Sequence, residues 1–83
     1  MSRVAVIGDD GTRPVVWGLG EDAESALADA QQWTDPGALA NVAYVDVTPE
    51  QADRILAGAV DCVALNIRVT YDRGGSIHAE VAS

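Results

Sequence analysis

The stretch that decides the fold is VVWGLGEDAESALADA, residues 15–30. It opens with a short β-branched and aromatic run, which favours a strand. From Ala23 onward the apolar residues recur at spacings of three and four, so they share one face of a helix. Asp22 is the expected N-cap, because its carboxylate can accept an unpaired main-chain N–H. The inner face of this helix would carry Ala23, Ala26, Leu27, Ala30 and Trp33, and the outer, solvent-facing side Glu24, Ser25, Asp29, Gln31 and Gln32.

Outward from this stretch, the apolar run 4–7 and the run 15–17 predict a hairpin with its turn at 8–11. The β-branched alternation over 42–47 predicts a further strand. Residues 48–51, Thr-Pro-Glu-Gln, predict the start of a second helix, with Thr48 as the cap and Gln51 completing a capping box. The expected buried stripe of that helix is Ala52, Ile55, Leu56 and Ala59.

The C-terminal stretch alternates between apolar and polar residues over 63–71 and again over 77–81, with a turn at 72–75. This pattern predicts a hairpin with one buried face. The order is then β-β-α-β-α-β-β. It predicts a two-layer α+β fold, with about five strands in a mostly antiparallel sheet and both helices on one face. Residues 1–83 are expected to form a single domain, because the chain holds no repeat and no linker.

The charge is strongly acidic: thirteen Asp and Glu stand against five Arg and no Lys, for a net charge of −8. Residues 9–61 hold eleven of the carboxylates and only two arginines. A direct nucleic-acid binder needs a basic face, which this chain cannot supply. No apolar run reaches the roughly 20 residues that span a bilayer. The single cysteine excludes an internal disulfide and fits a cytoplasmic location.

Two short motifs partly match known ligand-binding patterns. Residues 18–23, Gly-Leu-Gly-Glu-Asp-Ala, fit the letters of a dinucleotide-binding turn, but Glu21 and Asp22 would repel a pyrophosphate, so a tight strand-to-helix turn is favoured. Residues 9–11, Asp-Asp-Gly, suggest calcium, but Arg13 and Pro14 stand where further oxygen ligands are needed. An exposed hairpin loop is the favoured interpretation there, and no metal or cofactor is expected.

Cys62 and His78 are the only residues of their types, and both are predicted on the non-core side of the C-terminal hairpin. A nucleophilic pair would need them adjacent and oriented, so a small semi-buried thiol and a surface histidine are favoured over catalysis. Trp17 and Trp33 are expected in or near the core, with an interface anchor as the alternative. The sequence therefore predicts a protein that is not an enzyme.

The acidic surface has two interpretations: a solvated coat that keeps the protein soluble, or a binding surface for a basic partner. The absence of lysine favours the binding surface, because no Glu–Lys pairs weaken the negative electrostatic potential of the carboxylates. Glu24 and Asp29 would lie roughly 7–8 Å apart along a helix, near the spacing of phosphates two steps apart on one DNA strand. The partner-binding candidates are Asp9, Asp10, Glu21, Asp22, Glu24, Asp29 and Asp35, followed by Asp46, Glu50 and Asp53.

Two resemblances accompany these residues. Residues 15–30 resemble the strand–turn–helix segment of HicB-type antitoxins, where a glycine turn, an acidic pair and an Ala-Leu helix follow a hairpin. In size, acidity and architecture the whole chain is similar to small phage-encoded anti-CRISPR inhibitors. Several of those proteins imitate duplex DNA or cover the DNA-binding groove of a surveillance complex. This second resemblance rests on no motif and transfers no site residue.

We therefore expect a non-catalytic acidic inhibitor that binds a basic, nucleic-acid-binding surface of a protein complex. The resemblance implies a DNA mimic that blocks a multi-subunit, type I CRISPR surveillance complex in the host cytoplasm. The alternative is an antitoxin-like module that neutralises a small basic toxin. Direct nucleic-acid and membrane binding are not expected, and both a monomer and a homodimer joined through the C-terminal hairpin stay open.

Overall fold

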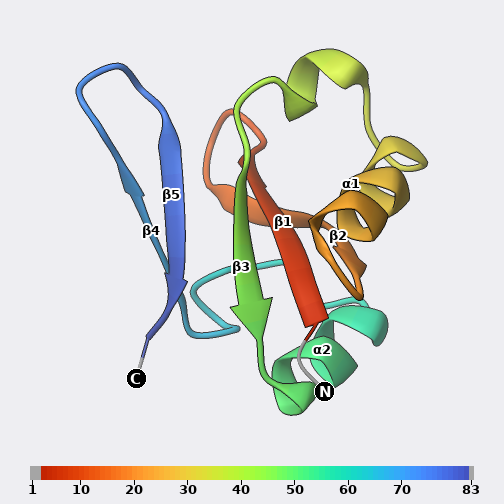
Figure 1. Cartoon of the computed structure of the whole chain (residues 1–83). Helices are drawn as coiled ribbons and strands as arrows, with labels where there is room; N and C mark the ends of the chain where they lie inside the picture. The colour runs from red at the N-terminus through yellow and green to blue at the C-terminus, as the bar shows by residue number, and fades with distance from the viewer. Residues whose placement is uncertain (1–2, 83) are drawn as a thin grey trace.

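The computed structural model describes residues 3–82 and confirms an α+β fold with the expected order of strands and helices. A short 3-10 helix, η1, is the one addition to that order among these residues. The elements are β1 (Arg3–Asp9), β2 (Pro14–Gly20), α1 (Ala23–Gln31), η1 (Pro36–Leu39), β3 (Ala43–Val47), α2 (Pro49–Leu56), β4 (Ile67–Tyr71) and β5 (Ile77–Val81) (Figure 1).

The strands form two antiparallel sheets and not the single five-stranded sheet that the sequence predicts. One sheet has the order β2-β1-β3, and the other is the β4–β5 hairpin. β5 runs beside β3 (Figure 1), but no ladder joins them within residues 3–82. The side chain of Asn41 takes the place of a ladder: its Oδ1 accepts from Ile77 N–H at 3.0 Å, and its Nδ2 donates to the Gly75 carbonyl at 2.7 Å.

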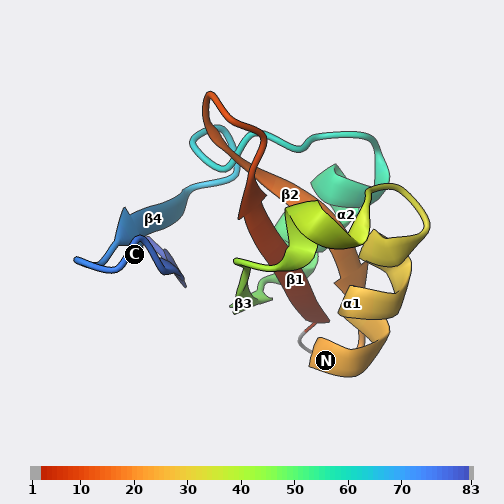
Figure 2. The same ribbon diagram turned by 90° about the horizontal axis from the view of Figure 1, so that it is seen from above.

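The two helices lie on opposite faces of the three-stranded sheet, so the prediction of both helices on one face is wrong (Figure 2). Val6 of β1 packs with Ala26 and Ala30 of α1. Its neighbours Ala5 and Ile7 point the other way, into the larger core that includes Ala52 of α2 and the buried face of the β4–β5 hairpin. β1 is buried on both faces, which explains why residues 4–7 are a continuous apolar run without alternation.

α1 begins as predicted, because the Asp22 side chain accepts a hydrogen bond from Ser25 N–H at 2.8 Å. The helix lies so close to β2 that a Cβ on Gly18 would stand 2.5 Å from the Ala26 carbonyl oxygen. A Cβ on Gly20 would stand 2.4 Å from Ala26 N. Both glycines belong to β2, which ends at Gly20. They therefore allow the helix to lie close to the strand, and the turn begins only after Gly20.

α2 carries the predicted capping box of Thr48 and Gln51, and Ala52 is buried as expected. Leu56 is 66% exposed, however, so its placement in the buried stripe is wrong. The helix ends at Leu56, and Gly58 has the left-handed φ of 110° that turns the chain away. Residues 60–61 then run beside β2, where Val16 N–H donates to the Val60 carbonyl at 2.9 Å.

The strand predicted over 63–71 is shorter than expected. Only Ile67–Tyr71 pairs with β5, and residues 62–66 form turns. The Asp61 carboxylate accepts from Val63 N–H at 3.0 Å, a local bond that competes with strand pairing. Asn66 adopts a left-handed φ of 62°. Val63 is consequently 80% exposed, while the predicted one-sided burial of the β4–β5 hairpin is confirmed at Ile67 and Ile77.

Candidate binding surface

The carboxylates are mostly without cationic partners. Within residues 3–82, ion pairs involve three of them: Asp61 with Arg13 at 3.7 Å, Glu80 with Arg68 at 3.2 Å, and Asp72 with His78 at 3.1 Å. The other ten acidic residues are all exposed except Asp29, which is half-buried. The chain therefore leaves most of its negative charge facing solvent without neutralising it.

The β1–β2 loop holds two of the predicted partner-binding residues in fixed positions. Asp9 accepts from Gly11 N–H at 2.7 Å through Oδ1 and from the Tyr71 hydroxyl through Oδ2. Asp10 Oδ1 accepts from Thr12 N–H, the Thr12 hydroxyl and Arg13 N–H at 2.8–3.0 Å. These contacts, led by the Thr12 main-chain bond, lower the pKa of Asp10 to about 2. The bond to Asp9 raises the pKa of Tyr71 to about 12.

We expect the Asp10 carboxyl to titrate with a midpoint near pH 2 when it is followed by NMR. A pKa below the ordinary 3.8 means that the charged form favours the folded state, so its contribution to stability is present above about pH 4 and is lost as pH falls towards 2. Thr12→Ala removes the hydroxyl donor and should move the midpoint upward. A midpoint near 3.8 in the unaltered protein would show that the loop hydrogen bonds do not hold in solution.

The acids of α1 do not form the row that the sequence suggests. Asp29 faces β2 and not solvent: its Oδ2 accepts from Leu19 N–H at 3.0 Å and its Oδ1 from Trp33 Nε1–H at 3.4 Å. Glu24 is exposed in the first turn, and five residues of helix put it about 140° around the axis from Asp29. The prediction that Asp29 lies on the water-facing side is therefore wrong.

The predicted residues divide into groups at the two ends of β2. Asp9 and Asp10 precede its first residue, Pro14, whereas Glu21, Asp22 and Glu24 follow its last residue, Gly20. A strand of seven residues separates them by roughly 20 Å. Asp22 is the helix cap, and the Ser25 N–H lowers its pKa. Asp35 precedes η1, and the second-rank candidates lie on β3 (Asp46) and α2 (Glu50 and Asp53).

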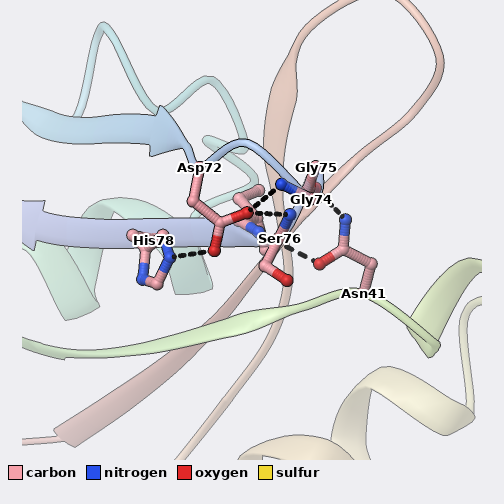
Figure 3. A network of polar contacts seen from close by, with 7 residues as sticks. Asn41, Asp72, Gly74, Gly75, Ser76 and His78 are labelled. Carbon is pink, nitrogen blue, oxygen red and sulfur yellow. Dashed lines mark hydrogen bonds and ion pairs between the residues drawn. The ribbon is translucent and has the colours of Figure 1, made fainter.

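A polar network surrounds the turn of the β4–β5 hairpin (Figure 3). Asp72 accepts from Gly74 and Ser76 N–H at 2.9 and 3.0 Å and pairs with His78, whose side chain is the main cause of the lowered Asp72 pKa. These contacts join the exposed turn to His78 in the first residues of β5, so the network shapes the hairpin. His78 is exposed as expected.

Cys62 is fully buried in the larger core, so its placement on the non-core side is wrong. Burial, with the nearby Asp61 charge, raises the pKa of its thiol to about 11. The thiol is therefore protonated at neutral pH, and the structure does not place it with His78, whose ring contacts Asp72. Within residues 3–82, no three side chains of His, Cys, Asp or Glu come together as metal ligands.

An apolar cleft of about 590 Å³ lies along the outer edge of β2, and the sequence does not predict it. The C-terminal ends of α1 and α2 form its walls with Trp33 and Leu56, which are 74% and 66% exposed. The prediction of a core position for Trp33 is thus wrong, whereas Trp17 is half-buried against the smaller core. One signal in the sequence could have indicated this exposure: Trp33 follows two polar residues, Gln31 and Gln32, which are the last residue and the C-cap of α1.

Comparison with known proteins assigns no family. No protein-family model matches the chain, and neither the curated proteins nor the solved structures yield a match. Among residues 3–82, no helix has the length and apolar character needed to cross a membrane.

Proposed function

We propose that this protein is a non-catalytic inhibitor that binds a basic, nucleic-acid-binding surface of a protein complex and takes the place of DNA there. One observation carries the proposal: nine exposed carboxylates have no cationic partner among the described residues. A basic groove that normally holds phosphates would supply the missing cations. Long-range attraction between the two surfaces would speed their association.

The fixed geometry of several carboxylates supports binding over a purely solubilising coat. Asp10 and Asp22 are held by main-chain N–H groups of their own turns, so they lose little conformational freedom when a partner arrives. Such groups present charge at defined positions, as a phosphate backbone does. The two acidic ends of β2 would form the contact, and Asp29 would not, because its oxygens are already engaged within the chain.

The resemblance to anti-CRISPR inhibitors suggests the target: a multi-subunit, type I surveillance complex, in the cytoplasm of the host cell. In this proposal the protein covers Arg and Lys side chains that otherwise hold target DNA. The protein itself binds no nucleic acid, because its net charge of −8 repels phosphates.

The test is competition between the protein and target DNA for a purified surveillance complex. We expect the protein to displace DNA, and its affinity for the complex to fall about tenfold between about 0.05 M and 0.3 M salt, because screening weakens exposed charge pairs. Glu21→Gln with Glu24→Gln should weaken binding about 3- to 10-fold, since both glutamates are exposed and neither forms an ion pair within residues 3–82.

The matched control is Glu80→Gln with Asp61→Asn, which removes the same charge from carboxylates that are already paired with arginine. We expect a smaller loss of affinity in this control. DNA binding that is unaffected by an excess of the protein, at low salt, would contradict the proposed target. Affinity that does not respond to salt would contradict an electrostatic mode of binding.

A further inference from the structure

The apolar cleft beside β2 exposes side chains that a small protein normally buries. Trp33, Leu56 and Val60 are all exposed, and together with Ile55 and the aliphatic residues of β2 they line one continuous hollow. Its volume of about 590 Å³ falls within the roughly 300–1,000 Å³ of typical ligand pockets. Exposed apolar side chains gathered in one hollow are characteristic of a contact site.

The edge of β2 determines how a partner could enter. The Val16 N–H already donates to the Val60 carbonyl, and the Leu19 N–H donates to Asp29 Oδ2. A bulge lies between these two positions, where the pairing with β1 shifts register. A partner strand could not form a regular ladder along this edge, since donors at both ends are occupied. The occupant must therefore insert side chains.

The rim of the cleft selects the charge of the occupant. Asp10 and Asp29 line it, and Arg13, the basic residue among the lining side chains, is paired with Asp61. The lining thus holds more acidic than basic side chains, and the exposed Asp10 is the carboxylate that can face a partner. A second copy of this chain would bring its own net charge of −8 and be repelled. A basic segment would gain Coulomb attraction from the same rim, and an arginine could stack on the exposed Trp33 ring.

We propose that this cleft is the docking site for an apolar side chain carried on an Arg- or Lys-rich segment of the partner protein. The inference rests on the proposed function and deepens it: the carboxylates attract the basic surface, and the cleft fixes the orientation through an apolar anchor. Trp33 and Leu56 would supply most of the contact energy, because large apolar walls around a desolvated anchor are typical of binding hot spots.

Three labelled peptides test this assignment by fluorescence anisotropy. The mixed peptide is Arg-Arg-Gly-Leu-Ile-Leu-Gly-Arg-Arg. The basic peptide replaces its apolar centre with Ser-Thr-Ser, and the neutral peptide replaces its arginines with glutamine. We expect the mixed peptide to bind at least about tenfold more tightly than either of the others at moderate salt. Trp33→Ser and Leu56→Ser should each reduce that advantage to less than about threefold.

The control is Val63→Ser, which removes an apolar side chain that is 80% exposed but lies outside the cleft, and it should leave all three affinities unchanged. Equal binding of the mixed and basic peptides would overturn the cleft assignment and leave the proposed function standing. Equal binding of the mixed and neutral peptides would overturn the basic character of the partner. Failure of the basic peptide to show any salt-dependent binding would count against the proposed function instead.

Discussion

Gly18→Ala should lower the free energy of unfolding by about 3 kcal/mol, at the upper end of what an added methyl group usually costs. The new Cβ would stand 2.5 Å from the Ala26 carbonyl oxygen and 2.7 Å from Ala30 N, both of which are main-chain atoms of α1. A side chain could rotate away, but a helix main chain can only move as a unit. Urea unfolding followed by circular dichroism would measure the loss, which for a domain of this size corresponds to roughly 12–24 °C in Tm.

Gly37→Ala is the matched control for this substitution. Gly37 lies in η1, its φ is outside the left-handed region, and a Cβ there would meet nothing within 4 Å. The free energy of unfolding of the Gly37→Ala variant should stay the same or rise by up to about 1 kcal/mol, because alanine reduces the conformational entropy of the unfolded chain. If Gly18→Ala and Gly37→Ala had equal stability, α1 would have to lie farther from β2 than this structure shows.

Gln51→Met should lower the free energy of unfolding by about 2–3 kcal/mol, although methionine nearly matches the glutamine in shape. The buried Gln51 amide donates to the Leu65 carbonyl at 2.6 Å, and its oxygen accepts from Thr48 N–H at 2.9 Å. The substitution would leave a buried carbonyl without its donor and would remove half of the capping box of α2. Equilibrium unfolding in urea gives the value directly.

Gln31→Met, on the exposed surface of α1, is the control for the loss of a glutamine amide. It should change stability by no more than about 0.5 kcal/mol. Should Gln51→Met prove equally mild, the link from α2 to residues 61–66 would contribute little to the fold. That result would leave apolar packing alone to hold α2 in place.

The local features of the fold were predictable because they depend on neighbouring residues. The caps of both helices and the turn of the C-terminal hairpin follow from side chains within four residues of the main-chain groups that they contact. The layering was not predictable in the same way. The apolar run 4–7 fits a strand covered on one face or on both, and only the positions of α1 and α2 distinguish these cases.

The candidate site shows the same division between local and distant contacts. The number of carboxylates and their grouping along the chain are visible in the sequence. The contact between Asp29 and Leu19 is not visible there, because these residues are ten positions apart and meet only through the close approach of α1 to β2. The cleft arises where the ends of two helices that are distant in sequence flank the same strand. Helical spacing alone assigned Trp33 and Leu56 to the core, because spacing does not show where the sheet beneath a helix ends.

The junction between β3 and the β4–β5 hairpin determines where the fold is expected to open first. One asparagine amide, supported by apolar packing, supplies two hydrogen bonds where neighbouring strands normally share a whole ladder. Partial opening would therefore start along this seam and release the hairpin as a unit, while β1 stays enclosed by its two partner strands. Asn41 thus supplies the hydrogen bonds between β3 and the hairpin, and the Tyr71 hydroxyl bond to Asp9 is a second polar link, between β4 and β1.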